Sequence, residues 1–104
     1  MIGYVISPNG TIKEKIFNDN NVLNEIQNEV NGYTETLTYL NEKVVIIVND
    51  EGKLLGLAPT CYIKRSVGID LLVGNVVILG ILNNDFCSIS ENKAISFIKK
   101  YMII

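Results

Sequence analysis

The order of apolar and polar residues at the start of the chain predicts a β-hairpin. Residues 2–7 (IGYVIS) are rich in the β-branched and aromatic side chains that favour strands, and residues 11–17 (TIKEKIF) return with apolar positions separated by charged ones. Between them, residues 8–10 are Pro-Asn-Gly, a turn sequence in which Asn and Gly accept the positive φ angles of a tight hairpin. We therefore expect two paired strands.

Apolar residues then recur at helical spacing over residues 19–32. The side chains of this apolar stripe are Val22, Leu23, Ile26 and Val30. Asp19 or Asn20 can cap the first turn with a side-chain oxygen, and Gly32 supplies a C-terminal stop. The pattern predicts an amphipathic helix that packs one face on a sheet. A partner-binding helix is the alternative interpretation.

The end of the chain predicts a second helix, which follows Ser90 as its cap. Lys99 and Lys100 lie near its C-terminus, where positive charge stabilises the negative end of the helix dipole. The predicted buried stripe of this helix consists of Ala94, Ile95, Ile98 and Met102.

Four further strands are predicted between the two helices. Residues 33–40 alternate Thr and Glu with larger side chains, as a strand with one solvated face does. Residues 43–48 and 75–82 are nearly continuous apolar runs, which is typical of buried central strands, and residues 86–89 form a short edge strand. Asn41-Glu42 is a short hairpin connection between the first two of these strands.

Residues 49–74 have a less regular pattern. Residues 49–53 (NDEGK) are typical of a strand-ending turn, in which Asn49 and Gly52 serve the backbone geometry. Pro59 interrupts the segment that follows, and we interpret residues 60–74 as an irregular connector that leads to the next buried strand.

The predicted elements follow the order β-β-α-β-β-β-β-α. They indicate the α+β class, as a single domain over residues 1–104 with a mainly antiparallel sheet of five to six strands and two helices packed on it. A chain of 104 residues is close to the commonest domain size.

Composition narrows the choice of function class. With 48% hydrophobic and 19% charged residues, the chain is not disordered and can fill a core without a disulfide or metal. A net charge of −2 argues against direct nucleic-acid binding, which needs clustered positive charge. The N-terminus lacks a basic leader, and the longest apolar run, residues 71–82, is too short to span a bilayer. We expect a cytoplasmic protein with no membrane partner, in which Cys61 and Cys87 stay reduced.

The chain contains no histidine, which excludes Ser-His and Cys-His nucleophile pairs and the usual histidine zinc sites. Two cysteines cannot complete a four-thiolate site, and no spacing of acidic residues or glycines matches a calcium loop or a phosphate loop. We therefore expect no metal, no cofactor and no catalytic residue. The alternative is a small cysteine-dependent enzyme, with Cys61 as nucleophile and Lys64 or Asp70 assisting.

The segment after Pro59 holds the candidate ligand-binding residues, which are Thr60, Cys61, Tyr62, Lys64 and Arg65. A guanidinium suits bidentate contact with phosphate, and a tyrosine ring can stack on a base. A small anionic ligand such as a nucleotide therefore fits this set. The alternative interpretation is an ordinary connector whose charges are simply solvated.

Most of the chain resembles a known family. Residues 32–59 (GYTETLTYLNEKVVIIVNDEGKLLGLAP) and 70–80 (DLLVGNVVILG) are similar to the family called domain of unknown function 3846, small proteins of phages, plasmids and other mobile elements. The resemblance covers about residues 20–100. The matching features are Gly32-Tyr33 at the opening of a strand, the turn with Gly52, the LxGLxP segment ending at Pro59, the step from Asp70 to Gly74, and the FxSISE passage of residues 86–91. It departs at Thr60-Cys61, where the family often carries Asn-Arg, so no binding role is carried over to those positions.

The resemblance implies a small accessory protein that acts by binding. We expect a non-enzymatic protein that binds or sequesters a host protein or a small ligand, as counter-defence or nucleotide sequestration requires. The alternatives are a direct nucleic-acid-binding module and a protein-inhibitor module. The surplus of Ile, Val and Leu also predicts a surface for homo-oligomer formation.

Overall fold

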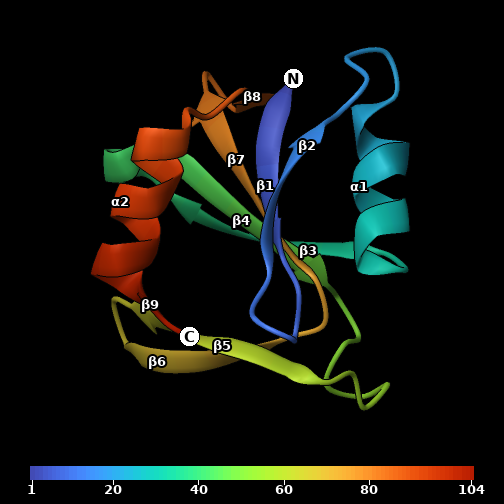
Figure 1. Cartoon of the computed structure of the whole chain (residues 1–104), viewed down its shortest axis with the longest axis vertical. Coiled ribbons are helices and arrows are strands. Elements are labelled where there is room, and N and C mark those ends of the chain that lie inside the picture. The colour runs from blue at the N-terminus through green and yellow to red at the C-terminus, as the bar shows by residue number, and fades with distance from the viewer.

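Nine strands and two α-helices form two antiparallel sheets, as Figure 1 shows for a computed structural model that describes all residues from 1 to 104. The elements are β1 (Ile2–Ile6), β2 (Ile12–Ile16), α1 (Val22–Val30), β3 (Thr34–Tyr39), the 3-10 turn η1 (Leu40–Glu42), β4 (Val44–Asn49), β5 (Pro59–Arg65), β6 (Gly68–Val73), β7 (Val76–Leu82), β8 (Asp85–Cys87), α2 (Glu91–Tyr101) and β9 (Met102–Ile103). This confirms the predicted α+β class and the mainly antiparallel sheet.

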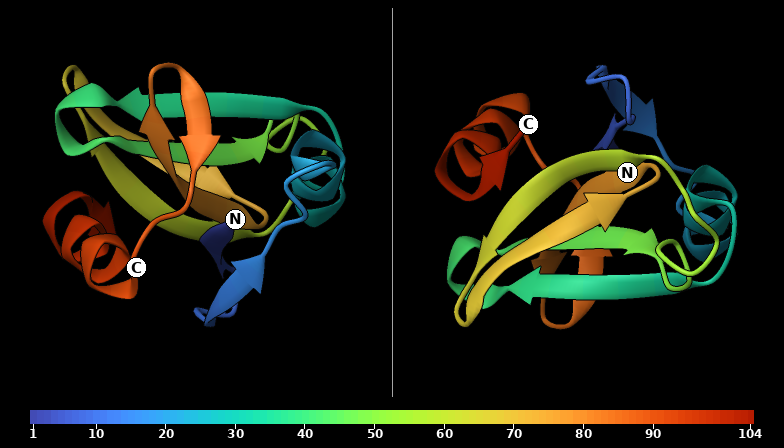
Figure 2. Two further views of the ribbon diagram at one scale, coloured as in Figure 1. Left: turned by 90° about the horizontal axis from the view of Figure 1, so that it is seen from above. Right: turned by 90° about the horizontal axis from the view of Figure 1, so that it is seen from below.

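The main sheet has the strand order β2-β1-β7-β4-β3, and β8 also pairs with β7. Strand β7 lies at its centre. One edge of β7 pairs with β4, while its other edge pairs first with β1, at Val76–Ile78, and then with β8, at Gly80–Leu82. The small sheet has the order β6-β5-β9. The small sheet lies against one side of the main sheet (Figure 2).

The two central strands are apolar at successive positions because both faces of the main sheet are covered. Val44 and Ile46 of β4 face a core cluster that α2 and the small sheet complete. Val45 and Ile47 face the opposite cluster, which α1 and Phe17 cover. Successive side chains of a strand point to opposite faces of the sheet, so a strand that is buried on both faces is apolar at nearly every position. The molecule thus has three layers, with α1, the main sheet, and α2 with the small sheet (Figure 2).

Residues 60–74 form the hairpin β5-β6, so the prediction of an irregular connector there was wrong. The period-two pattern was present in the sequence: Cys61 and Ile63 are buried, whereas Tyr62 and Lys64 are exposed. Gly68, with φ of +135°, opens β6 after a two-residue turn and takes a backbone conformation that other residues rarely adopt. The β-bulge between Pro59 and Cys61 interrupts this alternation at the start of β5.

The caps of helix α1 lie one or two residues away from the predicted ones. Asn21, not Asp19 or Asn20, occupies the N-cap position, and its side chain accepts from Asn24 instead of from the helix backbone. At the C-terminal end of α1, the residue with a left-handed backbone conformation is Asn31, with φ of 63°, and not Gly32. Asn tolerates this conformation almost as glycine does, because its short amide makes local hydrogen bonds.

Two residues assigned to apolar stripes point to solvent. In α1, Leu23 is exposed while Ile26 and Val30 are buried. In α2, Ile95 is exposed and Phe97 takes the buried position with Ala94. The helical face is rotated towards Phe97 because its ring packs against aromatic side chains from neighbouring elements.

The C-terminal boundary of α2 also differs, whereas its start is as predicted. Met102 is buried but lies in β9, beyond the end of α2 at Tyr101. The Ser90 hydroxyl accepts from the Lys93 N–H at 3.2 Å, which confirms the predicted cap.

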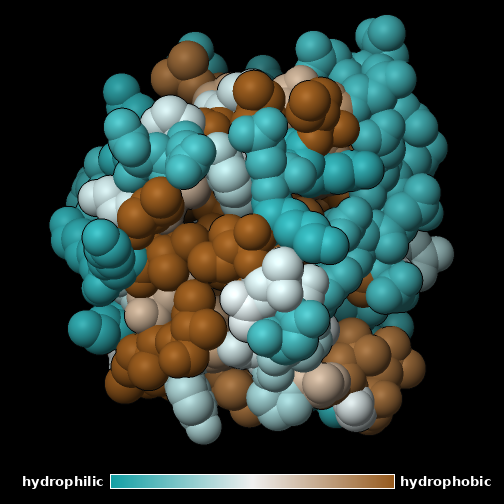
Figure 3. All heavy atoms as spheres, viewed as in Figure 1, coloured by the Kyte–Doolittle hydropathy of each residue, from teal (hydrophilic) through white to brown (hydrophobic).

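Polar side chains cover the solvent face of α1, whereas apolar atoms gather on the surface between α2 and the β1-β2 hairpin (Figure 3). The exposed apolar side chains include Ile12 of β2 and Ile95 of α2. The exposed face of α1 is therefore polar, whereas the surface beside α2 is apolar.

We expect Ile47→Ala to destabilise the fold by about 2–5 kcal/mol, because Ile47 is fully buried in a central strand and its loss leaves a cavity. Ile69→Ala, at an isoleucine near the start of β6 that is 62% exposed, should change the free energy of unfolding by less than about 0.5 kcal/mol. Urea denaturation followed by circular dichroism measures both. Equal effects of the two substitutions would contradict the layered core described above.

Candidate functional site

The five residues singled out after Pro59 lie on strand β5 and divide between its two faces. Thr60 and Cys61 are buried against the main sheet. Tyr62 and Lys64 project from the outer face of the small sheet. A β-bulge between Pro59 and Cys61 breaks the strict alternation and lets both Thr60 and Cys61 point inward. The structure therefore brings Tyr62 and Lys64 together but separates them from the hydroxyl and the thiol.

The two inward-facing side chains serve the packing of the small sheet. The Thr60 hydroxyl donates a hydrogen bond to the Gly74 carbonyl, which satisfies both groups inside the domain. Cys61 is 4% exposed in the core cluster, and this burial raises the pKa of its thiol to about 11. A nucleophilic cysteine needs a lowered pKa, so the surroundings of Cys61 oppose thiolate formation.

Arg65 and Asp70 meet at the periphery of the small sheet. An Arg65 guanidinium nitrogen lies 3.6 Å from one Asp70 carboxylate oxygen, and Lys53 Nζ lies 2.8 Å from the other. The hydrogen bond from Lys53 is the main cause that lowers the pKa of Asp70. Asp70 is thus an ionised partner of two cations, and part of the positive charge near Arg65 is already neutralised.

The outer face of the β6-β5-β9 sheet is the open surface that contains Tyr62 and Lys64. Tyr62 is opposite Leu71 on one side and Ile103 on the other, and Lys64 is opposite Ile69. Tyr62 is 49%, Ile69 62% and Ile103 48% exposed. We call Tyr62, Lys64, Ile69, Leu71 and Ile103 the outer face. It is the sheet surface seen from below in the right-hand view of Figure 2.

Analysis of the sequence alone missed three of these residues, namely Ile69, Leu71 and Ile103. The signal that could have found them is the alternation over residues 68–73, where Ile69 and Leu71 share one face and Asp70 and Leu72 the other. The contribution of Ile103 could not be found locally, because β9 is a two-residue strand that follows a helix.

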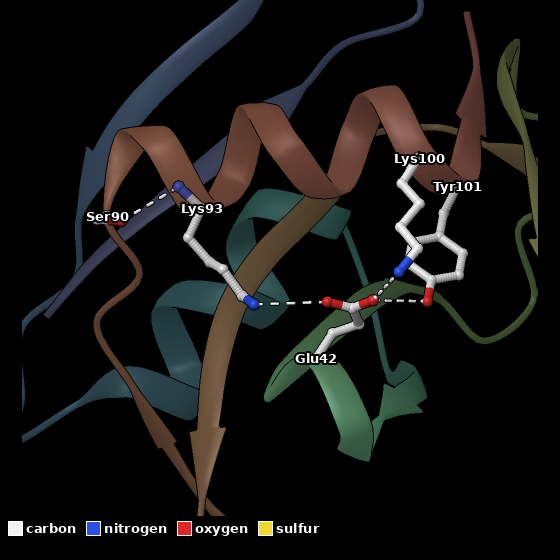
Figure 4. A network of polar contacts seen from close by, with 5 residues as sticks. All are labelled: Glu42, Ser90, Lys93, Lys100 and Tyr101. Atoms are coloured by element: carbon white, nitrogen blue, oxygen red, sulfur yellow. Dashed lines mark hydrogen bonds and ion pairs between the residues drawn. The ribbon is translucent and has the colours of Figure 1, made fainter.

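A second polar cluster surrounds Glu42 and joins η1 to α2 (Figure 4). Lys100 Nζ lies 2.8 Å and the Tyr101 hydroxyl 2.7 Å from the same carboxylate oxygen, and Lys93 Nζ lies 3.5 Å from the other. The hydrogen bond from Lys100, followed by that from Tyr101, lowers the pKa of Glu42 to about 2. These contacts fix α2 against the β3-β4 connection.

Tyr39 links α2 to the small sheet. Its ring packs on Phe97 and Tyr101, with both centroid separations at 4.9 Å. Its hydroxyl donates to the Lys64 carbonyl at 2.7 Å. One side chain of β3 therefore contacts α2 and β5 at once, so the position of the outer face depends on Tyr39.

Asn49 organises the turn that follows β4, as its position in the sequence predicts. Its amide nitrogen donates to the Val30 and Asn31 carbonyls at 2.9 and 3.2 Å, and its amide oxygen accepts from the Glu51 N–H at 2.7 Å. Gly52 is required because a Cβ there would lie 2.8 Å from a Val73 methyl group. The nearby cavity of about 350 Å³ is rimmed by acidic side chains, and the chain holds no group of three residues arranged to bind a metal.

The fold and these contacts define a small two-sheet α+β domain with an open apolar sheet face. The chain belongs to the family described as Domain of unknown function (DUF3846), whose model matches residues 1–102. The match confirms the resemblance and extends it to the N-terminal hairpin. No curated protein and no solved structure matches the chain. Neither helix is long and apolar enough to cross a membrane.

Cys61 should resist thiol reagents in the folded protein, because its thiol is buried and its pKa is raised to about 11. At pH 8, we expect Ellman's reagent to label at most Cys87 within minutes and to label both thiols after denaturation. Cys87→Ser provides the control, since it leaves Cys61 as the single thiol. Rapid labelling of folded Cys87→Ser would show that Cys61 is accessible and ionisable.

The Glu42 cluster predicts an acid-dependent loss of stability. Its folded pKa of about 2 lies below the ordinary value of 4.5, so its contribution is complete above pH 4.5 and is lost as the pH falls towards 2. The free energy of unfolding of the wild type should exceed that of Glu42→Gln at pH 7, and the difference should shrink between pH 4.5 and 2. Denaturant titrations at several pH values measure it. A difference that is constant with pH would contradict the assigned ionic contacts.

Proposed function

We propose that this protein is a non-enzymatic binding protein that binds a partner protein through the outer face of the β6-β5-β9 sheet. The observation that carries the proposal is the exposure of Tyr62, Ile69 and Ile103 side by side on one sheet face. Contiguous exposed apolar side chains with a polar rim are typical of protein interaction surfaces.

A protein partner is favoured over a nucleotide by the division of the candidate residues. Thr60 and Cys61 are turned into the core, and Arg65 is engaged with Asp70. Only Tyr62 and Lys64 remain free to contact a ligand on the outer face. A tyrosine, an ammonium group and flanking aliphatic side chains on an open sheet suit a flat protein surface better than a small anion, which needs several convergent donors.

The charge on this face indicates the chemistry of the partner. Lys64 makes no ion pair within the chain and stands among apolar side chains. A complementary partner presents an apolar patch with a carboxylate opposite Lys64, because such pairing steers association and fixes register. The mobile-element context that the resemblance implies makes a host protein the expected partner, with counter-defence as the biological role. A second copy of the chain is the competing occupant.

The test is affinity capture with matched surface variants. Tyr62→Glu and Ile69→Glu add a charge to the outer face, whereas Leu23→Glu adds one to an exposed leucine of α1 that is 54% exposed. We expect a protein retained by the wild type and by Leu23→Glu to be lost with both outer-face variants, by about tenfold or more. Retention by all three variants would refute this surface, and concentration-dependent self-association lost in the same variants would identify a second copy as the occupant.

A thermal-shift panel of mono-, di- and cyclic nucleotides tests the competing small-ligand function. Binding to the folded state raises the apparent melting temperature by mass action. We expect no shift at millimolar nucleotide. A shift that is abolished by Lys64→Ala would replace the protein partner with an anionic ligand.

A further inference from the structure

Strand β2 is an edge strand of the main sheet, and only one side of its backbone forms hydrogen bonds with a neighbouring strand. It pairs with β1 on one side and with no strand on the other. The Ser7 N–H donates to the Thr11 carbonyl at 2.9 Å and the Phe17 N–H to the Met1 carbonyl at 2.7 Å, which fixes the phase of the ladder. Because hydrogen-bonded and non-hydrogen-bonded pairs alternate in an antiparallel ladder, the N–H and C=O groups of Ile12, Glu14 and Ile16 point to the free edge.

A groove runs alongside this edge between β2 and α2. It has a volume of about 340 Å³, and Figure 3 shows hydrophobic residues on the surface between the helix and the hairpin. Ile12 and Tyr4 form the strand side, and Ile95 and Ile98 form the helix side. Ile12 and Ile95 are 45% and 41% exposed. The groove and the free backbone edge are therefore adjacent parts of one surface.

Two carboxylates make this groove acidic. Glu14 on β2 and Glu91 on α2 both line it, and neither takes part in an ion pair. The Tyr4 hydroxyl donates a long hydrogen bond of 3.5 Å to Glu14. Burial, with the charges of Glu14 and Glu91, raises the pKa of the Tyr4 phenol, as expected where two negative groups face the same space. No lysine or arginine of the chain lines the groove, so the charges of Glu14 and Glu91 are not neutralised there.

The lysines of β2 lie on the other face of the strand. Lys15 Nζ sits 5.9 Å from the centre of the Phe17 ring, on the side that α1 covers. Lys13 has the same orientation by strand alternation. The sequence of β2, Ile-Lys-Glu-Lys-Ile, is thus split into a groove face with one negative charge and an opposite face with two positive charges.

We propose that an extended segment of a partner protein adds to the free edge of β2 as a further strand and lays its alternate side chains along the α2 groove. The segment carries the pattern apolar–acidic–basic–acidic–apolar, with its basic side chain between Glu14 and Glu91 and its acidic side chains opposite Lys13 and Lys15. Strand addition derives affinity from the backbone and specificity from alternate side chains. Because the β2 sequence is palindromic, this pattern fits in both strand directions.

Charge disfavours a second copy of the chain at this edge. When β2 pairs with its own copy in either direction and in register, Glu14 faces Glu14 and lysine faces lysine. Like charges directly opposite one another destabilise a strand pair. The charged edge therefore disfavours self-association and favours a segment of complementary charge. The β2 edge and its groove are separate from the outer face of the β6-β5-β9 sheet, so binding at one surface can be tested independently of binding at the other.

The test is an NMR titration of the full-length protein with two synthetic peptides. One carries the core isoleucine–glutamate–lysine–glutamate–isoleucine, and the other carries the charge-swapped core isoleucine–lysine–glutamate–lysine–isoleucine, each with the same neutral flanks. We expect the first peptide to shift the amide signals of Ile12, Glu14 and Ile16 together with those of α2, and to bind roughly tenfold or more tightly than the second. Equal binding of both peptides, or no binding of either at about 1 mM, would overturn the proposal.

Three variants separate the backbone from the charges. Glu14→Lys should weaken the first peptide by about tenfold, whereas Glu35→Lys on β3, the opposite edge strand, should leave it unchanged. Ile16→Pro removes a free-edge N–H without touching the β1-β2 ladder and should abolish binding while the remaining spectrum is preserved. Full binding by Ile16→Pro would show that the groove acts without strand addition and would overturn the proposal. Ile69→Glu should bind the peptide normally, because its substitution lies on the outer face.

Discussion

Every other feature of this domain depends on the burial of β4 and β7 on both faces. These two strands pair with each other at the centre of the main sheet, and their side chains alternate between two core clusters. Apolar burial contributes roughly 25 cal/mol per Å², so a strand covered on both sides stabilises the fold at every position. It also requires a cover on each face, which α1 supplies on one side and α2 with the small sheet supplies on the other.

Polar side chains join these layers at a few points. The Asn49 amide nitrogen ties the end of β4 to the end of α1, and its amide oxygen accepts from the Glu51 N–H in the following turn. Glu42 and Tyr39 tie the β3-β4 connection to α2, and Tyr39 continues to the backbone of β5. Each contact satisfies a polar group that would otherwise lose its hydrogen bonds to water. They determine the position of the small sheet, and with it the position of its outer face.

The two proposed binding surfaces arise from the same layered arrangement. The small sheet uses its inner face to cover the core, so its outer face has no further layer to cover it. At the other end of the main sheet, α2 covers β1 but leaves the groove beside β2 open. A domain of this size has few elements with which to close both positions. Cys61 directly precedes Tyr62 in β5, but its thiol points to the inner face of the small sheet and is part of the core.

The sequence by itself determined the elements whose stabilising contacts are local or whose pattern is uniform. The β1-β2 turn, in which Gly10 but not Asn9 has a positive φ, the Ser90 cap and the apolar runs of β4 and β7 follow from short-range geometry and double-sided burial. Tertiary structure decided the β5-β6 hairpin, the choice of Phe97 over Ile95, and the contribution of Ile103 to the outer face. In each case the deciding neighbour is far away in sequence: β9 pairs with β5, and Tyr39 packs on Phe97. The alternation over residues 60–73 was visible in the chain, but only packing against the main sheet determined which of its two faces would be buried.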